Sequence, residues 1–144
     1  MEIDTMGKVL VAAKIENLGD LYFLDRGLLP ADQVRSVEVP DALVDTGATG
    51  LSVPKRLIAQ LGLKPFRTRQ ARTSGGVITL QIYDAVRLTI QGRECFCDVT
   101  ELPDDCPVWI GQIPLEALDW VVDPAGGRLI GNPEHGGEHI IELY

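Results

Sequence analysis

The fold is decided by one stretch of the chain, Ala42-Leu43-Val44-Asp45-Thr46-Gly47-Ala48-Thr49. It places the carboxylate of Asp45 directly after an apolar strand and before a glycine turn. A carboxylate in that position costs free energy unless its charge is compensated, and functional carboxylates collect at such positions. The alternative interpretation is an aspartate that ends a strand and bonds the backbone two residues on. Taken alone, Asp-Thr-Gly favours this second interpretation, because average residue usage produces so short a motif often by chance.

Alternation with period two predicts strands over most of the chain. Pro40 places the first half of one of these strands at an edge or a bend. The first two strands are expected to form a hairpin. The expected strands cover residues 8–15, 21–24, 37–45, 77–83, 86–90, 94–100 and 128–130.

Two short helices are expected between these strands. The first has Ser52 as its cap and Pro54 in its first turn, and Gly62 ends it. The second begins at Pro114 and runs through Leu118 toward Trp120. Six to nine short strands with one or two short helices predict a mainly β fold, a closed or partly closed barrel.

The 144 residues allow one domain, 1–144, with a core at about residues 6–131 and a C-terminal tail at 132–144. The net charge of −8 disfavours nucleic acid or an anionic membrane as a partner. The acidic start Met1-Glu2-Ile3-Asp4 lacks the features of a signal peptide, and no apolar stretch reaches the ~20 residues of a membrane span. We therefore expect a cytoplasmic protein.

Three cysteines raise the question of a metal site. Cys95 and Cys97 lie two positions apart on an expected strand, and Cys106 follows a turn. Two such cysteines can begin a zinc site, but no second pair or nearby histidine completes it. We expect buried thiols without a role in chemistry, and neither a metal nor a cofactor.

A weak internal repeat relates two parts of the sequence. Leu43-Val44-Asp45-Thr46-Gly47 is followed by Pro54 and a short helix, and Trp109-Ile110-Gly111 is followed by Pro114 and a short helix. This pattern predicts two similar halves about an internal pseudo-twofold axis, although chance produces such patterns as well.

The sequence resembles the retropepsin-like aspartic proteases, the single-lobe relatives of pepsin, over about residues 37–131. Three motifs occur in the family's order: a catalytic turn, a hairpin that forms the flap, and an apolar motif before the C-terminal helix. They are Leu43-Val44-Asp45-Thr46-Gly47-Ala48, Thr73-Ser74-Gly75-Gly76-Val77 and Val108-Trp109-Ile110-Gly111. The resemblance implies an all-β closed barrel of one lobe, and peptide hydrolysis by two aspartates that share a proton, without a metal.

The chain holds one Asp-Thr-Gly, so it carries half of such a site. The resemblance therefore implies a homodimer in which each subunit contributes Asp45. Thr46 would hydrogen-bond across the twofold axis, and Gly47 would let the backbone approach the partner and the substrate. Peptides with apolar side chains beside the scissile bond are the expected substrates. The expected substrate contacts are Ala48, Thr49, Ser74, Gly75, Gly76, Val77 and Ile110.

Several alternatives stay open. The domain could dimerise or bind peptides with little hydrolysis, it could be an unrelated β-barrel with a chance motif, and the flap segment could be a plain hairpin. Ala48 stands where many acid-active family members have serine, and it has no hydroxyl to donate to the catalytic carboxylate, so we expect a pH optimum nearer to neutral. Residues 139–144 are expected either to form the terminal strand that family dimers interleave or to be a flexible end.

Overall fold

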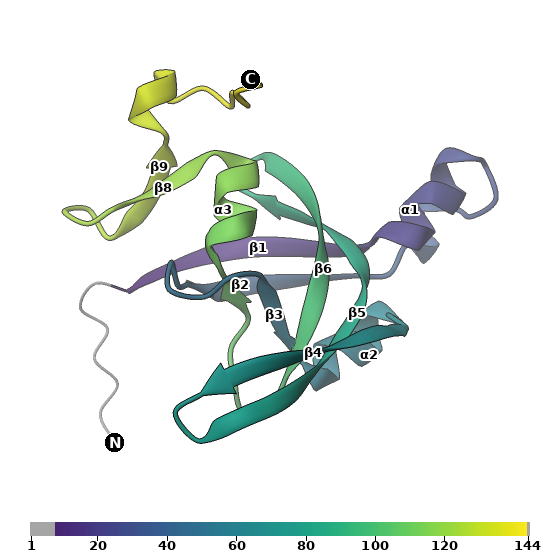
Figure 1. Cartoon of the computed structure of the whole chain (residues 1–144). Helices are drawn as coiled ribbons and strands as arrows, with labels where there is room; N and C mark the ends of the chain where they lie inside the picture. Colours follow the sequence, from purple (N-terminus) through teal and green to yellow (C-terminus); the bar gives the residue numbers. More distant parts are fainter. Residues whose placement is uncertain (1–7, 144) are drawn as a thin grey trace.

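The computed structural model describes residues 8–143 (Figure 1). Met1–Asp4, residues 6 and 7 of the expected core, and Tyr144 of the tail lie outside this range. The described strands are β1 (Val9–Asn17), β2 (Ser36–Val44), β3 (Leu51–Pro54), β4 (Pro65–Thr73), β5 (Gly76–Ile90), β6 (Arg93–Leu102), β7 (Trp109–Ile110), β8 (Trp120–Asp123) and β9 (Arg128–Gly131). The described helices are α1 (Leu18–Asp25), α2 (Lys55–Leu61) and α3 (Gln112–Leu118), with short 3₁₀ turns at Ala31–Gln33 and Pro133–His135.

Seven strands form one sheet in the order β1-β2-β7-β3-β6-β5-β4. Strand β1 also pairs with β5, which closes six strands into a ring and leaves β4 outside it. The contacts of β2 with β7 and of β3 with β6 are parallel, whereas the others are antiparallel. The prediction of a mainly β, closed barrel is confirmed.

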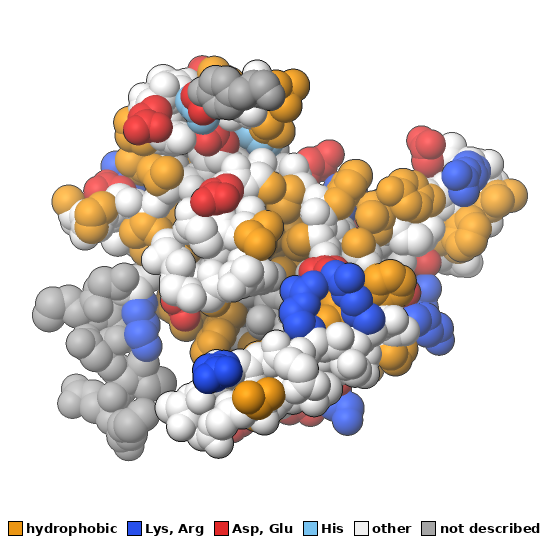
Figure 2. Space-filling view, in the orientation of Figure 1, with side chains coloured by type: hydrophobic (Ala, Val, Ile, Leu, Met, Phe, Trp, Pro, Cys, Tyr) orange, Lys and Arg blue, Asp and Glu red, His pale blue; other side chains and the backbone are white. Residues whose placement is uncertain are grey.

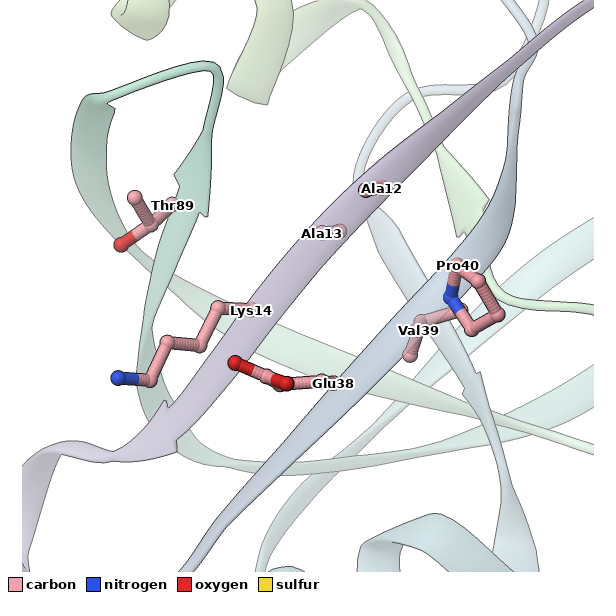
Figure 3. A pocket seen from close by; sticks show the side chains of 7 residues that line it. All are labelled: Ala12, Ala13, Lys14, Glu38, Val39, Pro40 and Thr89. Carbon is pink, nitrogen blue, oxygen red and sulfur yellow. The ribbon is translucent and has the colours of Figure 1, made fainter.

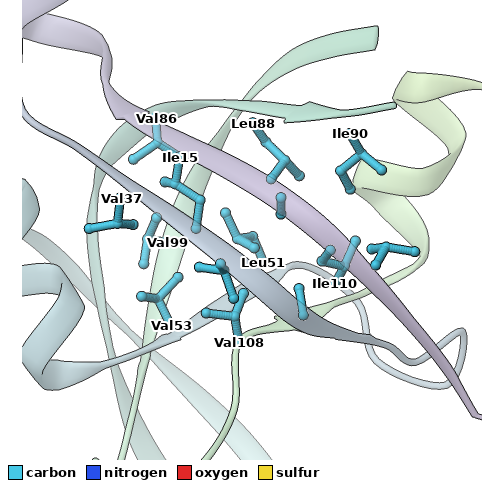
Figure 4. Packing of buried hydrophobic residues seen from close by; sticks show 14 of the residues in the cluster. Ile15, Val37, Leu51, Val53, Val86, Leu88, Ile90, Val99, Val108 and Ile110 are labelled. Atoms are coloured by element: carbon cyan, nitrogen blue, oxygen red, sulfur yellow. The ribbon is translucent and has the colours of Figure 1, made fainter. Parts of the chain in front are cut away.

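Aliphatic side chains fill the barrel (Figure 4). Their positions follow the strand period: alternate residues over the first half of β1 are buried, and Ile15 has no exposed surface. Burial of one such side chain stabilises the fold by about 1.5–3 kcal/mol. The ring is therefore a stiff support for the loops at its rim. The labelled members are Ile15, Val37, Leu51, Val53, Val86, Leu88, Ile90, Val99, Val108 and Ile110.

The expected early hairpin is wrong, because residues 21–24 lie in α1. Asn17 caps this helix by accepting a hydrogen bond from the Asp20 amide at 3.0 Å, and its side-chain nitrogen donates to the Leu61 carbonyl at 2.8 Å. Arg35 then forms a bidentate pair with the Asp20 carboxylate, at 2.8 and 2.9 Å. Partners far along the chain thus fix the helix. Strand β1 pairs with β2 and β5, and not with the strand that was expected at residues 21–24.

The other two helices are close to the expectation. Gly62 ends α2 in the left-handed conformation, at φ 64°, as predicted, but Pro54 occupies the N-cap and Ser52 lies in β3. Helix α3 stops at Leu118 because Asp119 adopts φ 57°, so Trp120 is not helical and begins β8.

Two bulges explain the irregular parts of the strand pattern. Pro40 lies inside β2 where the register with β1 shifts between Val11 and Ala13, a position that does not require its missing amide hydrogen. The expected break at residues 84–85 is a bulge within the single strand β5, where the register with β6 shifts between Tyr83 and Val86.

Candidate active site

Asp45 lies in a tight turn immediately after β2, and the backbone holds it there. Its amide donates to the Ile110 carbonyl at 2.9 Å, and its own carbonyl accepts from the Ala48 amide at 3.0 Å. The Gly47 amide donates to Asp45 Oδ1 at 2.9 Å. One carboxylate oxygen is therefore fixed by the turn, and the half-buried side chain has a defined orientation.

The second half of the internal repeat supports this turn directly. Strand β7 runs parallel to β2, and three successive amides then donate to three successive carbonyls of the loop after Asp45. They are Gln112 to Ala48, Ile113 to Thr49 and Gly111 to Gly50, each at 2.9 Å.

Gly111 is required by this contact. A Cβ atom on it would lie 2.6 Å from the Thr49 carbonyl carbon and 2.7 Å from the carbonyl oxygens of Thr49 and Gly50. The two similar motifs therefore lie side by side, with backbone against backbone.

The expected flap is a hairpin of β4 and β5. Thr73 pairs with Gly76, and the Thr73 hydroxyl donates to the Gly76 carbonyl at 2.9 Å and accepts from the Gly75 amide at 3.2 Å. Gly76 has φ 114°, which favours glycine, whereas Gly75 is not in the left-handed region. Ser74 and Val77 are exposed. In Figure 1 the tip of this hairpin and the loop between β2 and β3 reach toward the same side of the molecule.

A groove of about 390 Å³ separates the hairpin from the body of the protein. It is lined by segments of four strands and by the start of α3: residues 49–52, residues 69–71, Leu80 and Ile82, Cys97, Asp98 and Thr100, and Ile113 and Pro114. The basic side chains Arg67, Arg69 and Arg72 lie on the exposed strand β4, and Figure 2 shows Lys and Arg side chains over this hairpin. Of the predicted site residues, Thr49 lines this groove, whereas Asp45, Ala48 and the hairpin tip at residues 74–77 do not.

A family model described as aspartyl protease matches residues 33–123, more than half of the chain. The chain belongs to the aspartyl protease family. The match covers Asp45, the β4–β5 hairpin and all of β8. A search of curated proteins finds no match.

The structure of this aspartyl protease domain places the remaining predicted site residues as follows. Thr46, Gly47 and Thr49 are exposed and Ala48 is half-buried. Among residues 8–143, the Thr46 hydroxyl has no hydrogen-bond partner. The substrate contact expected for the Ile110 side chain is wrong, because that side chain has no exposed surface and belongs to the core.

Two residues that the sequence reasoning missed stand on the opposite side of the same strands. Val44 and Ile110 pair in register and point into the core, so their neighbours Leu43 and Trp109, also a register pair, lie on the other face. Asp45 follows Val44 directly, so the alternation places it on the same face as Leu43 and Trp109. The indole nitrogen of Trp109 is buried without a partner among the described residues. The alternation along each strand was the available signal: Leu43 precedes the buried Val44, and Trp109 precedes the buried Ile110.

Another concavity, of about 530 Å³, lies beside the Pro40 bulge between β1, β2 and β5 (Figure 3). Its lining includes Ala12, Lys14, Glu38 and Thr89, and no residue of the 45–48 turn contributes to it. It results from the bulge and is not part of the aspartyl protease site.

The cysteines of this domain are free thiols, each half-buried. A hydrogen bond with Cys97 lowers the pKa of Cys95, and the same bond together with burial raises the pKa of Cys97. Within residues 8–143, no cluster of His, Cys, Asp and Glu is placed to hold a metal ion. None of the helices in that range is long and apolar enough to cross a membrane.

Proposed function

We propose that the protein is a homodimeric aspartic endopeptidase whose active site combines Asp45 from two subunits. The braced turn supports this most strongly: a family member presents one oriented carboxylate, next to an exposed threonine, at the rim of a rigid barrel. A second carboxylate is needed for the shared-proton chemistry of aspartic proteases, and a twofold-related copy supplies it.

The reaction uses the two carboxylates in different protonation states. Two such groups about 3 Å apart share one proton, since both cannot carry a charge. The charged member removes a proton from a water molecule, and the water oxygen attacks the scissile carbonyl carbon. The protonated member donates a hydrogen bond to the carbonyl oxygen. The carboxyl that took the proton from water then gives it to the leaving nitrogen as the C–N bond breaks. This returns the dyad to one charged and one protonated member, without a covalent intermediate.

Other residues of the site bind and orient. The Gly47 amide holds Oδ1 of Asp45, and Thr46 hydrogen-bonds to the partner subunit across the axis. Ala48, Thr49 and the flap segment from Ser74 to Val77 contact an extended peptide, and Leu43 and Trp109 provide an apolar wall. We therefore expect apolar side chains beside the scissile bond. The free thiols support a cytoplasmic location, where thiols stay reduced.

Cleavage of a peptide library by matched variants tests the proposal. Asp45→Asn keeps the size of the side chain but removes the acid, so we expect a loss of at least about 10²–10⁴-fold in rate. Asp41→Asn is the control, because Asp41 is an exposed carboxylate on the same strand, outside the turn. Cleavage that survives in Asp45→Asn refutes the proposal. Peptides that bind to the unsubstituted protein and stay uncut favour a domain with a binding role.

A further inference from the structure

Residues 119–143 form an arm that follows α3. Its strands β8 and β9 make a two-stranded sheet that is separate from the barrel sheet. In Figure 1 this hairpin extends to the same side of the molecule as the catalytic turn and the flap tip. A two-stranded sheet is marginally stable in water by itself, so the contacts that hold it and the edge that it leaves open both matter.

The inner face of the arm is anchored on the barrel. Trp120 and Val122 pack against the core, and Leu129, paired with Val122, is 4% exposed. The Trp120 indole donates to the Ile90 carbonyl at 3.1 Å, and the Arg93 guanidinium lies 3.9 Å from the centroid of the Trp120 ring. Val121, opposite Ile130, therefore lies on the other face of the strand, where it is half-buried and lines a concavity of about 620 Å³ together with residues of α3 and the tail.

Asp119 clamps the tail to the base of the arm. Its buried carboxylate accepts from His135 Nδ1 at 2.6 Å, from the Asn132 side chain at 3.3 Å and from the Ile140 amide at 3.1 Å. The hydrogen bond with His135 holds the pKa of Asp119 at about 2, and the same bond raises the pKa of His135.

Gly131 brings the tail close to β9. A Cβ atom on it would lie 2.7 Å from the Cα of Gly137. Residues 138–143 form no strand and lie beside their own subunit. This contact, together with the Asp119 clamp, disfavours the tail as the strand that crosses to a partner.

The hydrogen-bond pattern shows which backbone groups of β8 are free. The Asn132 amide donates to the Asp119 carbonyl at 3.2 Å, so these two residues are a hydrogen-bonded pair at the end of the ladder. Such pairs alternate in an antiparallel sheet, so Val121 also bonds to β9, while Trp120 and Val122 turn their N–H and C=O groups away from it. Among residues 8–143, no strand pairs with this outer edge, and no backbone hydrogen bond from outside the hairpin reaches residues 120–122.

We propose that the outer edge of β8 pairs antiparallel with the same edge of a second copy, so that β9-β8-β8-β9 forms one four-stranded sheet across the twofold axis. The inference rests on the proposed function, because a single copy holds one carboxylate of the dyad. An open edge is a template for strand pairing, and identical strands related by a twofold axis run antiparallel. The register that uses every outward group puts Trp120 opposite the partner's Val122, and Val121 opposite the partner's Val121.

In this register, a charge introduced at position 121 lies opposite the same charge on the partner subunit. Residues opposite each other in a non-hydrogen-bonded pair have Cα atoms about 4.5 Å apart, and like charges there are destabilising. Val121→Lys and Val121→Glu each weaken dimerisation by about tenfold or more, and an equal mixture of the two restores it. The matched controls are Phe23→Lys and Phe23→Glu. Phe23 is 49% exposed and lies on α1, which extends away from the arm in Figure 1.

Sedimentation equilibrium on the Asp45→Asn background measures the dimer without any contribution from catalysis, and circular dichroism shows that each variant is folded. Dimers that are insensitive to charge at position 121, or variants that mixing does not rescue, overturn the inference. If the dimer responds as expected while unsubstituted protein cleaves no peptide, the proposed function is wrong and the interface stands. A chain that is monomeric at every concentration contradicts both.

Discussion

Gly111→Ala is expected to displace the turn that holds Asp45, although Asp45 itself is unchanged. The added Cβ would lie 2.6 Å from the Thr49 carbonyl carbon, whereas ordinary contact begins at 3.4 Å, so β7 and the loop must separate by about 0.8 Å. A misplacement of about 1 Å costs on the order of 100-fold in rate, equivalent to about 2.7 kcal/mol of transition-state stabilisation. Overpacking of this kind destabilises the fold by about 1–3 kcal/mol as well.

The assay compares kcat/KM on one library peptide with the midpoint of urea unfolding. Gly50→Ala is the matched control, because it lies in the same loop, has no heavy atom within 4 Å of its added Cβ and does not adopt a left-handed φ. We expect Gly50→Ala to keep the urea midpoint of the unsubstituted protein, and it is the control for stability only, because Gly50 also lines the groove. If Gly111→Ala equals the unsubstituted protein in rate and Gly50→Ala in stability, the second motif does not support the turn and the reasoning is refuted.

Three further predictions concern the rest of the molecule. Asn17→Ala removes a helix cap and leaves the Leu61 carbonyl unpaired, so urea unfolding should show a loss of about 2–4 kcal/mol, and a loss below about 0.5 kcal/mol contradicts the assigned contacts. The lowered pKa of Asp119 means that its contacts contribute full stability above the ordinary pKa of aspartate and lose it as the pH falls toward about 2. The raised pKa of His135 means that its contribution is complete below the ordinary pKa of histidine and is lost as the pH rises through the raised value. Protection of the amides of residues 138–143, taken as the ratio of the exchange rate of an unstructured peptide to the measured rate at the same pH, should therefore be highest between about pH 4 and 6.5. Asp119→Asn should remove this maximum in protection. Ala48→Ser adds a hydroxyl that stabilises the charged carboxylate of the dyad, so the acid limb of the pH–rate profile should move to lower pH, and an unmoved or raised limb contradicts this role.

Local signals predicted those parts of the fold that local chemistry determines. Gly62 ends α2 where a left-handed residue is needed, and the alternation at residues 77–83 and 86–90 predicted the two parts of β5, although not that they form one strand. Helix α1 could not be predicted in this way, because its apolar residues show no clear helical period. It is helical because Asn17 and Asp20 bind Leu61 and Arg35, and sequence periodicity carries no information on such distant partners.

The candidate site shows the same division. The Asp-Thr-Gly motif located the turn, and the support from Gly111 follows from a repeat that was visible in the sequence. The substrate contact predicted for Ile110 is wrong because Ile110 is the register partner of Val44, and both side chains point into the core. The separate sheet of β8 and β9 depends on the left-handed conformation of Asp119, a non-glycine residue for which the sequence gives no strong signal.

The central claim is that each active site needs Asp45 from two subunits, and a mixing titration tests it most directly. Unsubstituted and Asp45→Asn chains are combined at constant total concentration, unfolded and refolded together, and assayed on one peptide. If both carboxylates are required, activity follows the square of the unsubstituted fraction, and an equal mixture retains about one quarter of the activity. Activity that falls in simple proportion to that fraction, to about one half in the equal mixture, shows that a single chain is sufficient and contradicts the account.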